Sequence, residues 1–450
     1  MPSIAIAVSG GGHRASLFGL GVLMYLIDAG KNREVSSITS VSGGSLTNGY
    51  VGQTGNYRQM SPEEFRTALQ PFAERIASKG TLWAPLGTWL YVLLLVASLA
   101  AICAVCWLPV HWAARLGIGA VAVLAWAKLV AERRGAVCGW AFAKTLFSPK
   151  GSRTLLKDIR RDGIDHIICA TDLHAGEHVY FSGEFVCSYR FGWGQPGDLR
   201  LDQAVQASAA FPFAFPCRWY RTARHTFRQG TDEARFMVLS DGGVYDNMGE
   251  QWAIGLAARK RRWPEFADRL GDVDELVAVN ASAGMGWEPA WHLSLPLLGE
   301  LLTLNRVINV LHDNTLAPRK LRLIDQFDRA ARAGQGLRGA LVTIEQSPFK
   351  VPDFFLANAD DWPQRAERAR AVVEALGDDS REQWSATARN NASVKTSLNS
   401  LGKTASARLL HHAYVLAMAN LHVILDYPLL DIPPAEQFEE FVRGHATLGG

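Results

Sequence analysis

The chain has few charges for its length, few cysteines and no strongly basic region. Only 20% of its 450 residues are charged, the formal net charge is +3, and no basic stripe is interleaved with aromatic residues. This charge balance gives no reason to expect a nucleic-acid partner. The six cysteines are scattered, and none combines zinc-site spacing with nearby histidines. The sequence therefore predicts no metal and no cofactor, and a reducing compartment fits its cysteine usage best.

The N-terminus lacks the features of a secretory signal peptide. The stretch SIAIAVSGGG (residues 3–12) has a short apolar core, no preceding basic region, and a glycine loop directly after it. We therefore expect the chain to begin with folded structure.

Two long apolar runs are present between residues 86 and 130. The first, residues 86–108, carries no charge and is long enough to span the hydrocarbon core of a bilayer. The second, residues 110–130, carries only Arg115 and Lys128, both near its ends, where long side chains can reach the membrane surface. The short turn at Pro109 makes the pair a predicted helical hairpin.

The residues around this hairpin favour membrane insertion. Tryptophans lie near the edges of the two runs, as in an aromatic belt: Trp83, Trp89, Trp107, Trp112 and Trp126. Basic residues flank the hairpin on both sides: Arg66, Arg75 and Lys79, then Arg133, Arg134, Lys144 and Lys150. The positive-inside rule then predicts an integral membrane protein with both flanks, and its soluble part, on the cytoplasmic side. The alternatives are a hairpin that dips into one leaflet or packs on the rest of the chain.

The rest of the sequence alternates short apolar runs with helical patterns. The predicted strands cover residues 4–8, 37–41, 164–170, 179–181, 236–239, 276–280 and 341–344. The predicted helices begin near residues 16 and 43 and after the N-cap Ser61, and others cover about residues 201–210 and 405–425. This order is typical of an α/β sheet with helices on both faces. The Ser/Asn/Thr-rich residues 387–404 are typical of a mobile connection.

Ser42 stands between a predicted strand and two glycines, in SVSGG (residues 40–44). A sharp strand–Ser–helix turn is the nucleophile elbow G-x-S-x-G, here with Ser40 in place of the first glycine. Such a turn lifts the hydroxyl clear of the sheet and places it at a helix N-terminus, where the dipole favours negative charge. The competing interpretation of Ser-Gly-Gly is an ordinary N-cap and turn.

A second glycine-rich loop follows the first predicted strand. Gly10, Gly11 and Gly12 expose successive N–H groups before a helix, which is an arrangement that binds anions. The G-x-x-x-x-G-K-[ST] pattern of a phosphate loop is absent. Arg14 is expected either to support this loop or to meet a phosphate headgroup, and the alternative is a surface charge.

Asp241 opens the third motif, Asp-Gly-Gly, at the end of another predicted strand. Ligands of open α/β sheets bind at the carboxyl ends of the strands, so Asp241 is expected on the same rim as Ser42 and able to accept its proton. The competing interpretation is an Asx-turn aspartate. His13, His174 and His178 are loop candidates for a base, but each is better explained as structural or solvated, so no Ser-His-Asp triad is indicated.

Together these motifs resemble those of the patatin-like phospholipases. The similar stretches are GGGHRA (10–15), SVSGG (40–44), ATDLHAGEHVYF (170–181), AVQASAAFPFAFP (204–216) and DGG (241–243). The resemblance covers residues 4 to about 250, apart from the hairpin, and departs from the family pattern at Ser40 and Ala15, both small residues. It implies a three-layer α/β/α fold and a Ser–Asp dyad that works without histidine.

Carried onto this chain, the resemblance makes Ser42 the nucleophile and Asp241 the general base. The N–H groups of Gly10, Gly11 and Gly12 would form the oxyanion hole. The expected function is a membrane-associated lipid acyl hydrolase with a lipid substrate and no cofactor. The alternatives are an acyltransferase that uses the same acyl-enzyme and a non-catalytic membrane scaffold.

The expected organisation has four parts. Residues 1–84 would form the first part of the catalytic domain and 85–131 the inserted membrane hairpin. Residues 132–345 would complete the catalytic domain, and 346–450 would form a helical region packed on it. Nothing in the sequence indicates an oligomeric state.

Overall fold

The fold is built around one mixed sheet. A computed structural model describes residues 2–148, 151–212, 214–231, 234–284 and 298–444; Lys150 and the last six residues of the expected C-terminal region lie outside them. The strands are β1 (Ile4–Val8), β2 (Val35–Val41), β3 (Asp165–Asp172), β4 (Glu177–Ser182), β5 (Val186–Ser188), β6 (Gly192–Gly194), β7 (Arg218–Arg221), β8 (Arg228–Gln229), β9 (Phe236–Asp241), β10 (Glu275–Asn280) and β11 (Arg338–Thr343).

Sixteen α-helices are assigned within the described residues. They are α1 (Gly12–Asp28), α2 (Gly43–Thr54), α3 (Pro62–Ser78), α4 (Leu86–Cys103), α5 (Trp112–Leu129), α6 (Arg134–Thr145), α7 (Leu201–Ser208), α8 (Gln251–Ile254), α9 (Leu256–Arg262), α10 (Pro264–Ala267), α11 (Leu298–Ala333), α12 (Lys350–Ala357), α13 (Pro363–Leu376), α14 (Arg381–Ala392), α15 (Lys403–Leu425) and α16 (Ala435–Arg443).

The sheet has a parallel half and an antiparallel half. Its strand order is β11-β10-β1-β2-β3-β4-β5-β6-β8, with β9 paired to β3 and to β7. Along this order, the neighbouring strands from β11 to β3 pair in parallel. All other pairs, which involve β4, β5, β6, β7, β8 and β9, are antiparallel. All seven predicted strands are present, but the short strands β5 to β8 were missed, because they lack an apolar run long enough to stand out.

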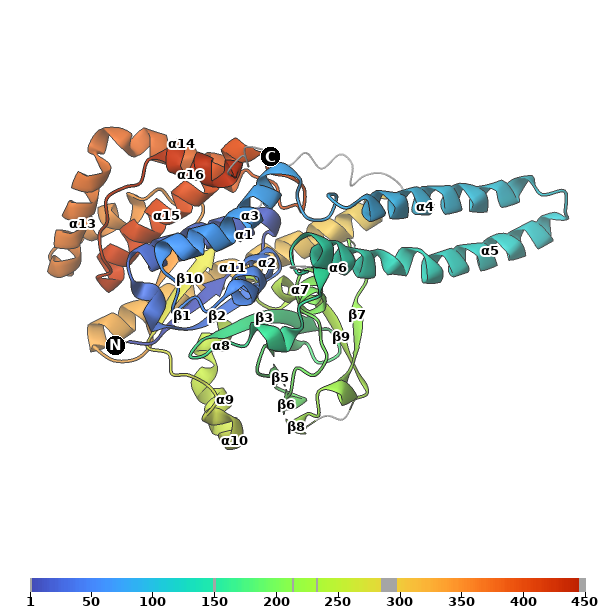
Figure 1. Cartoon of the computed structure of the whole chain (residues 1–450), viewed down its shortest axis with the longest axis horizontal. Helices are drawn as coiled ribbons and strands as arrows, with labels where there is room; N and C mark the ends of the chain where they lie inside the picture. Colours follow the sequence, from blue (N-terminus) through green and yellow to red (C-terminus); the bar gives the residue numbers. More distant parts are fainter. Residues whose placement is uncertain (1, 149–150, 213, 232–233, 285–297, 445–450) are drawn as a thin grey trace.

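Helices cover both faces of the sheet (Figure 1). Ile4, Ile6 and Val8 join the core formed with α1, α3 and α15, whereas Ala5 and Ala7 pack toward α11. Successive residues of a strand point to opposite faces, so both faces of a central strand must be apolar to be covered. The predicted three-layer α/β/α architecture is confirmed.

The helical hairpin α4–α5 projects from this body (Figure 1). Its apolar side chains are exposed: Leu93 is 64% and Val121 is 68% accessible. Between its helices, the Tyr91 hydroxyl donates to the Val130 carbonyl oxygen at 2.7 Å and Trp126 Nε1 donates to Ser98 Oγ at 3.0 Å. Both apolar helices, Leu86–Trp107 and Trp112–Thr145, are long enough to cross a membrane by length and composition.

The polar segment after α14 differs from its expected role as a mobile connection. Residues up to Ala392 belong to α14, and the following residues cross the end of α3. There, Leu401 N–H donates to the Ile76 carbonyl oxygen at 3.2 Å, and Ser400 Oγ donates to that of Ala77 at 2.8 Å. This segment is therefore hydrogen-bonded to backbone that is more than 300 residues away in the sequence. We call residues 393–402 the C-terminal strap.

Candidate functional site

Ser42 sits in a strained turn between β2 and α2. Its φ of 50° and ψ of −117° are rare for a residue with a side chain, and such strain costs on the order of 1–3 kcal/mol. The turn is held from α7, because the Ser42 N–H donates to Ser208 Oγ at 2.9 Å and Ser208 Oγ donates to the Cys169 carbonyl oxygen at 2.6 Å. Ser42 itself is only half-buried, so the turn presents its side chain at the surface of the site.

The two glycines after Ser42 allow the elbow to touch the glycine loop. A Cβ atom on Gly43 would lie 2.0 Å from the Gly12 carbonyl oxygen, and one on Gly44 would lie 2.7 Å from that of Ser9. No side chain fits at such distances. The glycines at 43 and 44 therefore bring the Ser42 turn into direct backbone contact with the loop after β1.

Ser40, which replaces the first glycine of the elbow pattern, is accommodated by hydrogen bonds. Its buried hydroxyl donates to the Ile167 carbonyl oxygen at 3.1 Å and accepts from Asn48 Nδ2 at 2.9 Å. A buried hydroxyl is costly only when it is unpaired. The substitution therefore keeps the turn without leaving an unsatisfied polar group.

Asp241 reaches the end of β2 from the opposite direction. Val41 pairs with Cys169 of β3, and Asp241 pairs with the next residue, Ala170. Strand β4 pairs with the other edge of β3 along Ile167–Asp172. Strands β2 and β9 therefore share the remaining edge of β3, where their C-terminal ends meet. Asp241 is thus beside Ser42, but the expected reason was wrong: β9 is antiparallel to β3 and does not end at the carboxyl rim of a parallel sheet.

The Asp241 carboxyl group is buried and only partly hydrogen-bonded. Its Oδ1 accepts from the Gly243 N–H at 2.8 Å, and Oδ2 has no hydrogen bond of good geometry within the described residues. Burial raises the pKa of Asp241 to about 6, while the Gly243 N–H and the Ser42 hydroxyl act in the opposite direction. A carboxylate with this pKa is ionised near neutral pH and is a stronger base than an exposed aspartate.

The glycine loop offers fewer free donors than the sequence suggests. The Gly10 N–H donates to the Asn247 carbonyl oxygen at 2.9 Å, which counts against its expected role as an oxyanion donor. Gly11 and Gly12 have φ values of 139° and 58°, and the described part of the chain provides no acceptor for either N–H. A Cβ atom on Gly10 would lie 3.1 Å from the Ser42 Cβ, so this loop lies beside the serine.

Arg14 and His13 anchor the glycine loop to the C-terminal part of the chain. Arg14 is 6% exposed, and its Nη1 donates to the carbonyl oxygens of Ala392 and Val394 at 3.1 and 2.7 Å. Of its two expected roles, loop support fits this position, and neither a headgroup contact nor a surface charge does.

The histidines near the motifs have structural partners. His13 Nδ1 faces the Asn399 carbonyl oxygen at 2.7 Å, so it carries the proton, and Nε2 accepts from Thr81 Oγ1 at 2.9 Å. His178 Nε2 faces the Gly242 carbonyl oxygen at 3.0 Å. Burial lowers the pKa of both rings to about 4, so they are neutral at physiological pH and committed to these bonds. His174 contributes a backbone N–H bond to Asp172 Oδ1.

Both ends of the hairpin connect to this site. On the α4 side, Thr81 binds the His13 ring and also donates its N–H to the Leu398 carbonyl oxygen of the strap at 3.3 Å. On the α5 side, α6 packs on α7, and Cβ atoms on Gly135 and Gly139 would lie 3.3 and 3.5 Å from Gln206. The same α7 ends at Ser208, which holds the Ser42 turn.

Sequence reasoning missed Ser208 and the role of Asn247. Asn247 donates its Nδ2 to Ser282 Oγ, and a Cβ atom on Gly10 or on Gly243 would lie 2.3 or 2.6 Å from its Oδ1. The side chain therefore separates the glycine loop from the aspartate turn and fixes their spacing. Its place four residues after the last glycine of the DGG motif was the only available hint.

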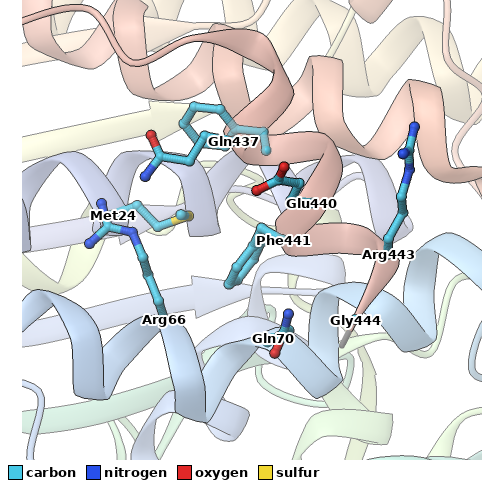
Figure 2. A pocket seen from close by; sticks show the side chains of 9 residues that line it. Met24, Arg66, Gln70, Gln437, Glu440, Phe441, Arg443 and Gly444 are labelled. Atoms are coloured by element: carbon cyan, nitrogen blue, oxygen red, sulfur yellow. The ribbon is translucent and has the colours of Figure 1, made fainter. Parts of the chain in front are cut away.

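An open cavity of about 410 Å³ lies elsewhere, between α3 and α16 (Figure 2). Arg66 and Gln70 border it from α3, and Glu440 and Phe441 from α16. None of its lining residues belongs to the three motifs. Arg66 forms an ion pair with Asp28, and this pair gives it a structural role.

Comparisons with known proteins agree with this architecture. The sequence model described as patatin-like phospholipase matches residues 6–254, which include β1, the Ser42 turn and the Asp241 turn. The chain therefore belongs to the patatin-like phospholipase family. No curated protein sequence gives a significant match.

Two solved structures illustrate the likeness. Human GIVD cytosolic phospholipase A2 is 13% identical, with a TM-score of 0.37, over 63% of this chain and 43% of that one. The match thus spans less than half of the human enzyme's chain. VipD from Legionella pneumophila is 12% identical, with a TM-score of 0.25, over 97% and 93% of the two chains.

Proposed function

We propose that this chain is a membrane-attached lipid ester hydrolase in which Ser42 is the nucleophile and Asp241 the general base. Membership of the patatin-like phospholipase family supports hydrolysis of lipid esters. The observation that carries the finer assignment is the meeting of β2 and β9, which brings a strained, half-exposed serine next to a buried aspartate with a pKa of about 6.

In this mechanism, Ser42 Oγ attacks the acyl carbonyl carbon while Asp241 accepts the hydroxyl proton. The N–H groups of Gly11 and Gly12 donate to the oxyanion of the tetrahedral intermediate, and one such donor typically contributes about 3 kcal/mol. The C–O bond then breaks, and the leaving alcohol takes the proton from Asp241. Water attacks the acyl-enzyme, Asp241 accepts the water proton and returns it to Ser42, and the fatty acid leaves.

We further propose the four-part organisation that the sequence suggests. Residues 85–131 interrupt the catalytic domain as a membrane hairpin, between residues 1–84 and 132–345, and residues 346–450 form a C-terminal helical region. The contacts of Thr81 and α6 support this proposal, because the hairpin ends where the site begins. Insertion would therefore hold the site at the bilayer surface and raise the local concentration of lipid.

A fluorophosphonate probe tests the chemistry directly. We expect labelling of the wild-type protein in detergent and none of Ser42→Ala. Ser78→Ala is the matched control, because Ser78 is exposed at the end of α3 and its hydroxyl only donates to the Glu74 carbonyl oxygen. Labelling that persists in Ser42→Ala would refute the nucleophile.

Product analysis with phospholipid vesicles then tests the reaction. Free fatty acid released by wild type and not by Ser42→Ala is the expected result. Acyl chains that appear on an added alcohol or lysolipid, without free fatty acid, would assign acyl transfer instead. Absence of both labelling and product in a folded wild-type protein would favour a scaffold.

A further inference from the structure

The ribbon formed by β7 and β9 has one apolar buried face and one aromatic, basic outer face. Tyr220 pairs with Met237 across the ribbon, and both are buried. On the outer face, Trp219 is 68% and Phe236 is 37% exposed, and their rings meet edge to face with centroids 5.9 Å apart. Arg221 lies opposite Phe236 and is also exposed. We call Trp219, Arg221 and Phe236 the ribbon face.

The sequence around this face is basic. Four arginines lie between residues 211 and 231, with no Asp or Glu among them: Arg218, Arg221, Arg224 and Arg228. Arg221 has no ion pair within the described residues. An exposed pair of aromatic rings beside an arginine without an ion pair suits a surface that is apolar below and anionic above.

The β7–β9 ribbon lies on the side of the body from which the hairpin projects (Figure 1). Strand β7 runs along that edge, next to α6 (Figure 1). Arg218, its first residue, donates to Gln206 of α7, and a Cβ atom on Gly139 of α6 would lie 3.6 Å from Arg218 Nη1. The ribbon therefore starts at the base of the hairpin.

The other end of the ribbon leads into the site. Strand β9 runs from Phe236 to Asp241, so the exposed aromatic residue and the proposed base lie on one strand of six residues. Phe211, which is also exposed, follows Ala210, whose carbonyl oxygen accepts the Asp241 N–H at 3.0 Å. A surface that holds this ribbon would also fix the position of Ser42 and Asp241 relative to it.

We propose that the ribbon face docks on the headgroup layer of an anionic phospholipid bilayer, in the same leaflet that the hairpin enters. This inference rests on the membrane attachment proposed above. Trp is favoured at the boundary between headgroups and hydrocarbon, and Arg binds phosphate groups through two donors at once. The hairpin then supplies attachment, and the ribbon face sets the orientation of the body and its preference for negatively charged lipid.

A fluorescent probe on the native thiol of Cys217 reports on this docking, because Cys217 is exposed and lies two residues before Trp219. Full-length protein with Cys103→Ala and Cys106→Ala is labelled there with an environment-sensitive dye and reconstituted into vesicles. We expect a blue shift in vesicles with about 30% anionic lipid, a smaller shift in neutral vesicles, and loss of the difference at high salt, because screening weakens surface charge interactions.

The matched variants are Arg221→Gln on the ribbon face and Arg33→Gln on the exposed turn after α1. Each basic residue near an anionic surface strengthens binding roughly fivefold. We therefore expect Arg221→Gln to lower kcat/KM on anionic vesicles about fivefold, with no change on neutral vesicles or on a soluble short-chain ester. Trp219→Ala with Phe236→Ala should lower the rate on both kinds of vesicle, and Phe354→Ala, another exposed aromatic change, should not.

The proposal would be overturned if the dye showed no blue shift in either kind of vesicle and Arg221→Gln had the same kcat/KM as wild type on both. A blue shift that needs an added protein instead of lipid would assign the face to a protein partner and would also overturn it. Fluorophosphonate labelling in detergent is independent of the bilayer, so its loss would refute the proposed chemistry and leave the dye result unchanged.

Discussion

The α/β body and the α4–α5 hairpin contain similar residues in opposite environments. In α1, residues such as Val22 and Leu23 are fully buried between β1 and α15, whereas Leu93 of α4 and Val121 of α5 are largely exposed. Body helices bury a face against protein, and the hairpin helices have almost no protein to pack on. The same hydrophobic residues thus stabilise a core in one region and, by our proposal, favour insertion into lipid in the other.

The two regions also treat glycine differently. In the body, Gly43 permits a backbone contact that no side chain would allow, whereas Gly117 and Gly119 in α5 have open space around them. Tight packing makes the body sensitive to one added methyl group, and the hairpin should tolerate it. The following predictions sharpen this contrast, from the largest expected effect to the smallest.

Two charges in the middle of the hairpin should prevent its insertion. We expect Leu93→Arg with Val121→Arg to move the protein from the membrane to the soluble fraction, because each central arginine costs about 3 kcal/mol on insertion scales, or about 6 kcal/mol together. Alkaline washing of membranes measures this partition. The matched control is Leu86→Arg with Leu129→Arg, at the ends of the helices, where the side chains can reach the membrane surface. Unchanged partition of the central variant, with Ser42 still labelled, would show that the hairpin does not span the bilayer.

Replacement of the proposed base should abolish activity. We expect Asp241→Asn to lower kcat about 10³- to 10⁴-fold, or about 4–5.5 kcal/mol in the barrier. For the wild type, kcat/KM should rise with pH through about 6, because the base acts only when it is ionised. A wild-type rate that stays flat down to pH 4.5 would contradict the assignment.

The same variant, Asp241→Asn, should make the fold more stable although it lowers activity. The pKa of Asp241 is higher in the folded state than its ordinary value of 3.8, so its ionised form destabilises the fold above about pH 6, and this penalty disappears as the pH falls toward 3.8. The difference between the pKa values of about 6 and 3.8 corresponds to about 3 kcal/mol in the free energy of unfolding. Asp241→Asn should therefore unfold at a higher temperature than wild type at pH 8, and the gap should shrink at pH 4.5. An equal gap at both values would argue against the raised pKa.

One added methyl group should distinguish the two regions. Gly43→Ala would place its Cβ on the Gly12 carbonyl oxygen and push the elbow off the glycine loop. We expect at least a 100-fold slower reaction with fluorophosphonate, or about 3 kcal/mol. Gly117→Ala should leave the rate unchanged and favour the helix by up to about 1 kcal/mol. Equal rates for the two variants would mean that the elbow and the loop are not packed as described.

The junction between the regions should respond weakly. Gly87→Ala in α4 would bring its Cβ to 2.5 Å from the Trp140 ring of α6, which a small helix shift can relieve. We expect a loss of about 1 kcal/mol in stability, within the range of mild overpacking, and a labelling rate within twofold of wild type. Thermal unfolding of Gly87→Ala against Gly119→Ala, which has open space, measures the difference. A tenfold lower labelling rate would show that the base of the hairpin controls the site.

Local patterns predicted much of the fold because their causes are local. The capping box before α3 has both of its hydrogen bonds: Glu64 N–H donates to Ser61 Oγ at 3.2 Å, and Ser61 N–H donates to Glu64 Oε2 at 2.8 Å. The start of α1 was placed too late, because Gly11 and Gly12 adopt positive φ and let the helix begin directly after the loop.

Long-range contacts account for what sequence reasoning missed. Asp241 was expected on the right rim for the wrong reason, since strand direction depends on pairing with β3 and not on the run that forms β9. The strap looked like a mobile connection, yet it binds His13 and the end of α3 more than 300 residues away. Ser208 and Asn247 have no distinctive spacing, and only folding brings them to Ser42 and Gly10.

The amino-acid sequence alone determined the family, the apolar hairpin and the expectation of a serine and an aspartate at one site, because each depends on a short stretch with its own chemical pattern. The tertiary structure alone decided which glycine N–H groups are left unpaired, how burial raises the pKa of Asp241, and that the base of the hairpin adjoins the site. These properties depend on which groups from distant segments exclude water from one another, and no local pattern encodes that.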